Sequence, residues 1–198
     1  VPMRIVHSPE NAPAKGMYAL LTASITPRPI AWVSTVSSDG TPNLAPYSFF
    51  TIACTDPAIL SVTSIGHKDT WRNVEATGEF VVNIGTESLM EVMNATSAPF
   101  SPESNEFAEV GLTAAASDVV AAPRVAEAPI SFECVRHDII ELGTSAMLLG
   151  RVVSVSIEDE VMADDGLPDF ESLLPPSRLG RSQWGYAPRT RELPRPMK

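Results

Sequence analysis

The residues best suited to chemistry lie in one short stretch, "SIGHKDTWRN", which covers positions 64–73. The chain has a formal net charge of −10, yet here the single acid Asp69 is surrounded by three basic residues, His67, Lys68 and Arg72. A glycine that permits a tight turn, a lysine and a helix start together form a site for an anion, because free backbone N–H groups and the helix dipole favour negative charge. The stretch also fits a capped surface helix with scattered charges, and taken alone it leaves both interpretations open. It is not a Walker phosphate loop, because the GxxxxGK[ST] arrangement is missing.

Two further segments carry side chains suited to ligand binding. In "TPRPIAW", Pro27 and Pro29 hold the backbone extended around Arg28. Its guanidinium suits a phosphate or a carboxylate, and a solvent-exposed arginine between two prolines is the alternative. In "NLAPYSFF", Pro46 limits ladder pairing, so the hydroxyl of Ser48 and the nearby amides are free to face a planar heterocycle such as a flavin. The aromatic residues of this segment also fit a hydrophobic core.

Other catalytic templates are missing. The histidines His7, His67 and His137 have neither a nucleophile elbow nor a metal-binding spacing, and no GxGxxG follows a strand. Cys54 and Cys134 each lie in an apolar segment without a CxxC partner, so we expect two buried thiols and no zinc site. No catalytic acid or base is identified, and a bound cofactor would have to supply any redox chemistry.

The composition limits the classes of function. With 198 residues, of which 44% are hydrophobic and 19% charged, the chain suits one globular domain with appendages. The net charge of −10 argues against nucleic acid and anionic membranes as partners, because no basic face is available to neutralise phosphates. We expect no signal peptide, since Pro2, Pro9 and Pro13 interrupt the N-terminal stretch, and no run approaches the roughly 20 apolar residues that span a bilayer. We therefore expect a cytoplasmic protein.

Strands are predicted on both sides of the candidate binding segments. Residues 30–36 are rich in β-forming types and are followed by Asp39-Gly40, a strong hairpin signal. Pro46 places the next segment at an edge, a bulge or a bend. Residues 58–65 form a clean strand, and "EFVVNI" predicts another.

Short helices are predicted at two places. Asp69 or Thr70 is expected to cap a helix over "TWRNVEAT", and Gly78 lies where a left-handed residue commonly ends a helix. A second helix is indicated at "SLMEVM", where Ser88 and Glu91 have the spacing of a capping box.

The second half of the chain predicts further strands around a long connection. Residues 95–129 are expected to make a surface excursion with one short helix at "NEFAEV". "ISFECV" and "AMLLGRVVSVSIE" then predict strands, with Gly150 as a bulge. This inventory favours a mainly β fold: a closed or nearly closed antiparallel barrel with Greek-key connections and a few short helices packed outside.

Four blocks together, "TPRPIAWVSTVSSDGTPNLAPYSFF", "SIGHKDTWRNVEATGEFVVNI", "MNATSAPF" and "LGRVVSV", resemble the flavin reductase-like family of FMN-binding split-barrel proteins. The resemblance runs from about Met17 to about Tyr186. It implies an antiparallel Greek-key split β-barrel and a homodimer with FMN near the subunit interface. It divides the chain into an N-terminal extension (1–16), an FMN-binding split-barrel domain (17–186) and a Pro/Arg-rich C-terminal tail (187–198).

The resemblance also implies a set of cofactor-binding residues. Arg28 would lie near the phosphate or the ribityl chain, and Trp184 would be a lid over the flavin. The isoalloxazine would be lined by Ser48, Phe49 and Phe50. Ribityl and phosphate oxygens would be held by Ser64, Lys68, Asp69 and Thr70, with Asn83, Asn94, Ala95 and Thr96 close by.

The activity implied by the resemblance is that of an FMN-dependent oxidoreductase. A hydride would pass from NADH or NADPH to FMN, and the electrons would pass on to a second flavin, oxygen or a partner oxygenase. Many members carry one histidine after a Gly-Asp pair and another near the end of the long strand, where this chain has "LGTSAML" and "SVSI". These absences favour an alternative, a flavoredoxin-like FMN electron carrier without NAD(P)H turnover of its own. A binding protein with an empty barrel is a third interpretation.

Overall fold

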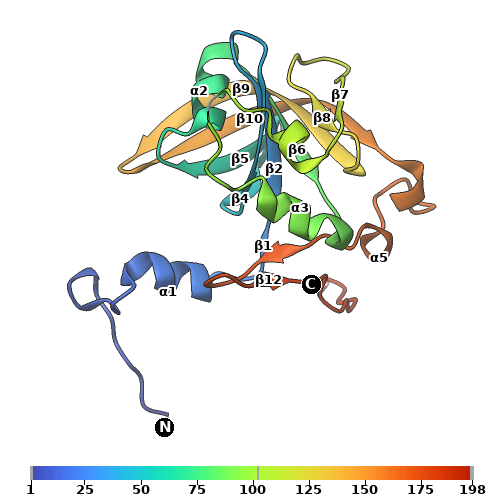
Figure 1. The fold of residues 1–198 in the computed structure, drawn as a ribbon. Helices are drawn as coiled ribbons and strands as arrows, with labels where there is room; N and C mark the ends of the chain where they lie inside the picture. The colour runs from blue at the N-terminus through green and yellow to red at the C-terminus, as the bar shows by residue number, and fades with distance from the viewer. Residues whose placement is uncertain (1, 102, 197–198) are drawn as a thin grey trace.

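One antiparallel sheet of seven strands curls into a split barrel and dominates the fold (Figure 1). The computed structural model describes residues 2–101 and 103–196. The strand order is β3-β2-β6-β9-β10-β5-β4, so the hairpins β2-β3, β4-β5 and β9-β10 are joined by Greek-key crossovers, as the sequence predicted. The barrel strands are β2 (Ala31–Val36), β3 (Pro42–Tyr47), β4 (Phe50–Thr55), β5 (Ala58–Ile65), β6 (Glu79–Ile84), β9 (Ile130–Leu142) and β10 (Ser145–Ile157).

The split lies between the edge strands β3 and β4. Only Ser48 and Phe49 connect these strands along the chain, and the Phe49 carbonyl accepts a 2.8 Å hydrogen bond from the Thr63 N–H of β5. Pro46 belongs to edge strand β3, where its missing N–H costs no ladder bond on the outer side. The opening of the barrel is therefore set by a two-residue link beside a proline.

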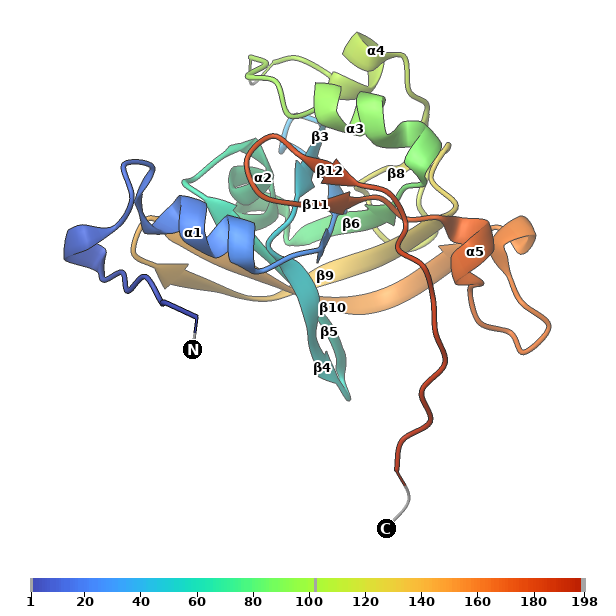
Figure 2. The ribbon, with the colours of Figure 1, turned by 90° about the horizontal axis from the view of Figure 1, so that it is seen from below.

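Short helices and two small sheets lie around the barrel. Figures 1 and 2 show α1 outside the barrel body, beside the sheet formed by β1, β11 and β12, with both ends of the chain running away from it. No helix of the described residues is long and apolar enough to cross a membrane. These elements are α1 (Gly16–Ser24), α2 (Asp69–Thr77), α3 (Met90–Ala95), α4 (Glu106–Val110), α5 (Phe170–Leu173), the 3₁₀ turns η1 (Pro9–Asn11), η2 (Glu87–Leu89) and η3 (Asp159–Val161), and the strands β1 (Arg28–Pro29), β7 (Ala114–Ala115), β8 (Arg124–Val125), β11 (Ser177–Arg178) and β12 (Trp184–Gly185).

Both faces of strand β2 are buried, which explains its almost continuous apolar sequence. Val33 points into the barrel core with Phe80, whereas Trp32 points outward into a second cluster that contains Phe107 of α4. Residues 95–129 are therefore more than the surface excursion that we expected, because they cover the outer face of β2. The rest of this outer cluster is Ile30, Leu44, Met93, Val125 and Ala128.

The predicted bulge at Gly150 is confirmed. The register between β9 and β10 shifts between Leu149 and Gly150. A Cβ at position 150 would lie 2.2 Å from Cζ of Phe80 and 2.9 Å from Cβ of Cys134, so only glycine fits this close approach.

The strands predicted at 58–65 and 79–84 are confirmed to the residue, but the predicted N-cap of the helix that follows residue 68 is wrong. Helix α2 has Lys68 as its N-cap, with no side-chain cap, and ends at Gly78 with φ 75° as expected. Asp69 instead pairs with Arg72, and the Thr70 hydroxyl donates to Asn43. Each side chain therefore bonds to another side chain and not to the N–H groups at the start of the helix.

The predicted capping box is also wrong. Helix α3 begins at Met90 with Leu89 as its N-cap, and no side chain caps it. Ser88 lies in η2, where its hydroxyl pairs with that of Thr86 at 2.7 Å. The preceding 3₁₀ turn therefore delays the start of the helix beyond the expected cap.

Both cysteines are free thiols. Cys134 is fully buried, and burial raises the pKa of its thiol to about 12. Cys54 is only partly buried, so the prediction of two buried thiols holds fully for Cys134 alone.

Candidate functional site

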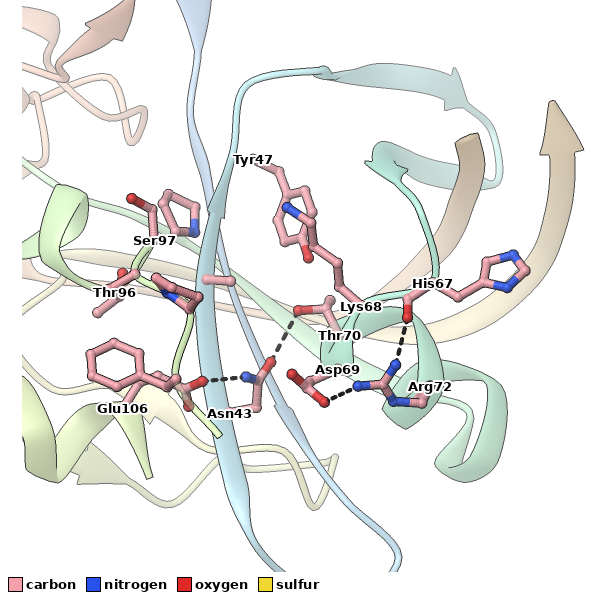
Figure 3. Close-up of a pocket in the computed structure, with 15 residues that line it drawn as sticks. Asn43, Tyr47, His67, Lys68, Asp69, Thr70, Arg72, Thr96, Ser97 and Glu106 are labelled. Atoms are coloured by element: carbon pink, nitrogen blue, oxygen red, sulfur yellow. Dashed lines mark hydrogen bonds and ion pairs between the residues drawn. The ribbon is translucent and has the colours of Figure 1, made fainter. Parts of the chain in front are cut away.

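A cavity of about 430 Å³ lies where α2 begins (Figure 3). Three segments that are distant in the sequence form its walls: strand β3, the start of α2, and the chain that follows α3. The lining residues are Asn43, Ala45, Pro46, Tyr47, His67, Lys68, Asp69, Thr70, Arg72, Thr96, Ser97, Ala98, Pro99, Phe100 and Glu106.

Among the described residues, Lys68 is the cation of this cavity that has no protein partner. The Arg72 guanidinium pairs with Asp69 and donates to the His67 carbonyl at 2.6 Å. The His67 ring points away from the cavity in Figure 3, and its Nε2 lies 3.2 Å from Glu141. Within the described part of the chain, the Lys68 ammonium has no hydrogen bond or ion pair. It is therefore available to an anionic ligand.

A buried polar network forms another wall of the cavity. The Glu106 carboxylate accepts hydrogen bonds from the Asn43 side-chain amide at 2.7 Å and from the Leu44 N–H at 3.2 Å. Oδ1 of Asn43 then accepts from the Thr70 hydroxyl at 3.0 Å. Burial, with a smaller contribution from the charge of Asp69, raises the pKa of Glu106, and the hydrogen bonds oppose this rise. Sequence reasoning missed Asn43 and Glu106, because each is a single polar residue whose partner lies far along the chain.

The hydroxyl of Tyr47 is buried without a hydrogen-bond partner among the described residues. The side chain is 7% exposed and lines both the first cavity and a second cavity of about 140 Å³. Burial raises the pKa of Tyr47, so the phenol stays a neutral donor. The neighbouring hydroxyls of Thr70 and Ser64 oppose this rise of the pKa, although neither makes a hydrogen bond of good geometry with Tyr47. The Tyr47 side chain packs in the barrel core, so its buried hydroxyl is directed into the protein and not toward a ligand.

Three cavities adjoin one another across the split end of the barrel. The second shares Tyr47 and Ser97 with the first, and it shares Ser48 and Arg178 with a third cavity of about 560 Å³. The third lies between α1 and the β11-β12 hairpin. The three cavities together form one elongated groove, which suits an extended ligand better than a compact one.

Eight of the residues predicted from the sequence line this groove. Lys68, Asp69, Thr70 and Thr96 line the first cavity. The Thr96 hydroxyl is already engaged, since it donates to the Met93 carbonyl and accepts from the Trp32 indole. The second cavity is lined by Ser48, Asn94 and Trp184, and the third by Arg28 and again Ser48.

The other five predicted residues, Phe49, Phe50, Ser64, Asn83 and Ala95, line none of these three cavities. The Phe49 ring lies 5.9 Å from the Arg28 guanidinium, and Phe50 lines a separate apolar groove along β4 and β5. Ser64 donates to the Gly66 carbonyl at 2.8 Å. Ala95 is exposed. Their assignment to a flavin stays a prediction.

Asn83 is fully used by the protein itself. Its amide donates to the Trp32 carbonyl at 2.9 Å and to Ser34 at 3.0 Å. Its carbonyl accepts from the Val125 N–H at 3.0 Å and from the Ser131 hydroxyl at 2.8 Å. Asn83 therefore ties the 95–129 segment to the barrel.

Arg28 joins the two ends of the folded chain. Its guanidinium donates to the Thr22 and Ile25 carbonyls, both at 2.6 Å, to the Leu179 carbonyl at 2.9 Å and to the Ser48 hydroxyl at 3.3 Å. The residue is 8% exposed. The two flanking prolines do fix the guanidinium, but its donors meet backbone carbonyls of α1 and of the β11-β12 loop.

The groove fits FMN. At one end, Lys68 offers a phosphate a cation that no described residue pairs with. The second cavity offers Ser48 and the Trp184 indole, which suit the edge and face of a planar ring. The groove thus has a charged end and an aromatic end, and these match the phosphate and the ring of FMN.

Comparison with known proteins points the same way. A family model described as "Flavin reductase like domain" matches residues 23–171. An uncharacterized protein of Halalkalibacterium halodurans is 37% identical over 201 residues, which cover 96% of this chain and 95% of the relative. The chain thus matches its relative along nearly the whole length of both.

Two solved structures are similar over the whole fold. Nitrilotriacetate monooxygenase component B from Bacillus cereus is 36% identical, with a TM-score of 0.92, and the match covers 98% of this chain and 100% of that chain. The 2-nitrobenzoate 2-nitroreductase NbaA from Pseudomonas fluorescens is 29% identical, with a TM-score of 0.89, over 97% of this chain and 96% of that one.

Proposed function

Because the chain belongs to the flavin reductase-like family, we propose that it is an FMN-dependent oxidoreductase that takes a hydride from NADH or NADPH. The electrons then pass to a second acceptor. The observation that carries the proposal is the groove, in which the Lys68 ammonium, unpaired among the described residues, lies at one end and the Ser48 and Trp184 cavity adjoins it.

The protein contributes binding and orientation. FMN, when bound, supplies the two-electron chemistry that no side chain of the groove provides. Lys68 would hold the phosphate, and Ser48 would offer its hydroxyl to a polar edge of the ring. Trp184, which is held in β12 and lines the second cavity, would cover the ring.

Reconstitution tests the proposal directly. Purified protein should bind FMN with a shifted visible spectrum and should oxidise NADH or NADPH faster than free FMN does. Lys68→Ala should weaken FMN binding by about 1.5–3 kcal/mol, the range for a charge-assisted hydrogen bond, and should leave riboflavin binding nearly unchanged. Arg191→Ala, which removes an exposed cation of the C-terminal tail, is the matched control. The proposal fails if no NAD(P)H oxidation above free flavin is found, and equal losses for FMN and riboflavin would show that Lys68 does not face the phosphate.

An FMN electron carrier without NAD(P)H turnover is the second candidate. Among the described residues, the second and third cavities are lined by no histidine, aspartate or glutamate, the side chains that most often act as acids or bases in catalysis. The net charge of −10 would also suit docking of a basic redox protein. Stopped-flow mixing separates the candidates: rapid bleaching of bound flavin by NAD(P)H supports the oxidoreductase, and bleaching only by a reduced protein partner supports the carrier.

The second electron acceptor is part of the proposal. The name of the Bacillus cereus relative describes one component of a monooxygenase, so we propose a partner oxygenase as one acceptor, beside free flavin and oxygen. A cell extract supplemented with the reduced protein should show an oxygenase activity that the unsupplemented extract lacks.

We further propose a homodimer with FMN near the interface. The β4-β5 hairpin projects from the barrel (Figure 2) and carries Ile52, which is 68% exposed. Beside it lies an apolar groove of about 680 Å³ whose lining includes Phe50, Val155 and Leu173 and no charged side chain. A projecting apolar residue next to an apolar groove is self-complementary across a two-fold axis.

Light scattering on the wild type and on Ile52→Asp tests the dimer. A dimeric wild type and a monomeric variant are expected, because the aspartate would be buried without a partner. A monomeric wild type would refute the dimer without affecting the flavin proposal.

A further inference from the structure

The third cavity gathers positive charge in an acidic protein. Its lining contains Lys15, Arg28, Arg178 and Arg181 and no aspartate or glutamate, in a chain of net charge −10. The walls between these cations include alanine, leucine and proline side chains. The cavity is thus amphipathic and positively charged, although the chain as a whole is negatively charged.

This positive charge is not neutralised by the protein. Within residues 2–101 and 103–196, the side chains of Lys15 and Arg181 have no hydrogen bond or ion pair. The Arg178 guanidinium donates to the Gln183 carbonyl at 2.6 Å and to the Arg181 carbonyl at 3.2 Å, and it lies 5.6 Å from the Trp184 ring. None of these partners is a carboxylate. Cations held together without an acid repel one another, and an anion would relieve that repulsion.

The pKa of one member reflects the same crowding. Burial lowers the pKa of Arg28, and the nearby charge of Arg178 lowers it further. Arg28 donates its hydrogen bonds to backbone carbonyls and to Ser48. It therefore contributes positive charge to the cavity, and the hydrogen bonds to an anion would come from the neighbouring cations.

The cavity is built by fixed elements. Gly180 packs directly on α1, since a Cβ there would lie 2.8 Å from Cα of Ala23. Figure 2 shows α1 beside the loop between β11 and β12, and the Arg28 hydrogen bond to Leu179 links the same two elements. The two walls are therefore held at a set distance, as a specific site requires.

We propose that this cavity binds the phosphate-bearing adenosine half of the pyridine nucleotide, through Lys15, Arg178 and Arg181. The inference rests on the proposed function, because the cavity adjoins the Ser48 and Trp184 cavity assigned to the flavin ring. Several cations without an acid match a ligand with several negative charges. A volume of about 560 Å³ also suits a nucleotide fragment, whereas a single-ring aromatic acid would leave most of it empty.

Direct binding tests the site without any redox reaction. Calorimetry on FMN-loaded protein would use adenosine 2′,5′-bisphosphate and ADP-ribose as probes, with benzoate as a small aromatic acid. The variant carries Lys15→Ala and Arg181→Asn, because asparagine tolerates the positive φ of 58° at position 181. Arg191→Asn in the tail is the matched control.

We expect both nucleotide probes to bind the wild type and the control, and the double variant to bind them at least about tenfold more weakly. FMN affinity should be equal in all three proteins. A stronger effect on the bisphosphate than on ADP-ribose would assign the cations to a 2′-phosphate, and the reverse would assign them to the pyrophosphate; both outcomes support the site.

Three results would overturn the inference. These are absence of nucleotide binding to the wild type, equal binding to wild type and double variant, and binding of benzoate in place of the nucleotides. A loss of FMN affinity in the double variant would show that the cavity holds the flavin phosphate instead. Failure of the proposed function would be seen separately, as absence of FMN binding or of flavin reduction in the wild type.

Discussion

Glu133 is expected to be one of the most important single residues for stability. Its side chain is fully buried on β9, and its carboxylate accepts three backbone hydrogen bonds, from Asp118 at 2.8 Å, Val119 at 2.7 Å and Val120 at 3.1 Å. The carboxylate therefore replaces water for three consecutive N–H groups of the loop before β8. Removing it leaves those donors without an acceptor.

The magnitude follows from the number of bonds. Hydrogen bonds to a charged group contribute about 1.5–3 kcal/mol each, which would give about 4.5–9 kcal/mol if the three were additive. Asp118 and Val119 are exposed residues, so their N–H groups can regain water when the loop lifts. We therefore expect Glu133→Ala to lower the free energy of unfolding by about 3–5 kcal/mol.

Glu133→Gln is the more discriminating change. An amide keeps the shape but offers one acceptor oxygen, so its NH₂ group must face at least one of the three N–H donors. The expected loss is about 1–3 kcal/mol. A loss as large as that of the alanine variant would indicate that charge, and not the number of acceptors, holds the loop.

Urea unfolding followed by tryptophan fluorescence measures both variants. Glu127→Ala is the control, because Glu127 also accepts from a backbone N–H, that of Thr113 at 2.9 Å, but at an exposed position. Its cost should stay below about 1 kcal/mol. If Glu133→Ala cost no more than this control, the assignment of Glu133 as the anchor of the loop would be wrong.

Three further changes test the core and the site. Gly150→Ala should lower the free energy of unfolding by about 1–3 kcal/mol in urea titration, because the new Cβ collides with Phe80; an unchanged midpoint would refute the close approach. Burial raises the pKa of Glu106 above its ordinary value of about 4.5, so the native state binds more protons than the unfolded state, and the free energy of unfolding should fall as pH rises from about 4.5 through the raised pKa. Glu106→Gln should abolish that slope, and equal slopes in both proteins would contradict it. In Cys54→Ser protein, the remaining thiol of Cys134 should resist a thiol reagent at pH 8 and react only in denaturant, since its pKa is about 12 and it is buried; reaction in the native state would disprove its burial.

The sequence predicted those strands, helix ends and bulges whose cause lies within a few residues along the chain. The strand at 58–65 and the end of α2 at Gly78 follow from residue periodicity and from the φ that glycine permits. The bulge at Gly150 was visible as a glycine inside a long apolar strand. In each case the decisive partner lies within a few residues or the residue type itself carries the constraint.

The candidate site was only partly predictable, because long-range partners decide the role of its polar residues. Asn43 and Glu106 are 63 positions apart, and nothing near either residue indicates the other. The prolines beside Arg28 correctly indicated a fixed guanidinium, but Leu179, one of its acceptors, lies 151 positions away. Glu133 sits on an alternating strand whose outer face looks solvent-exposed until the 95–129 segment covers it.

The hydrogen bond from Arg28 to Leu179 also has a consequence for biosynthesis. One wall of the third cavity comes from α1, which leaves the ribosome before the barrel strands, and the other comes from the β11-β12 loop, which leaves it after them. Until Leu179 emerges, the Arg28 guanidinium lacks that acceptor and the cavity has one wall. A nascent chain can therefore close its barrel and bury its core before the third cavity exists, so this cavity can bind a ligand only after the β11-β12 loop has been made.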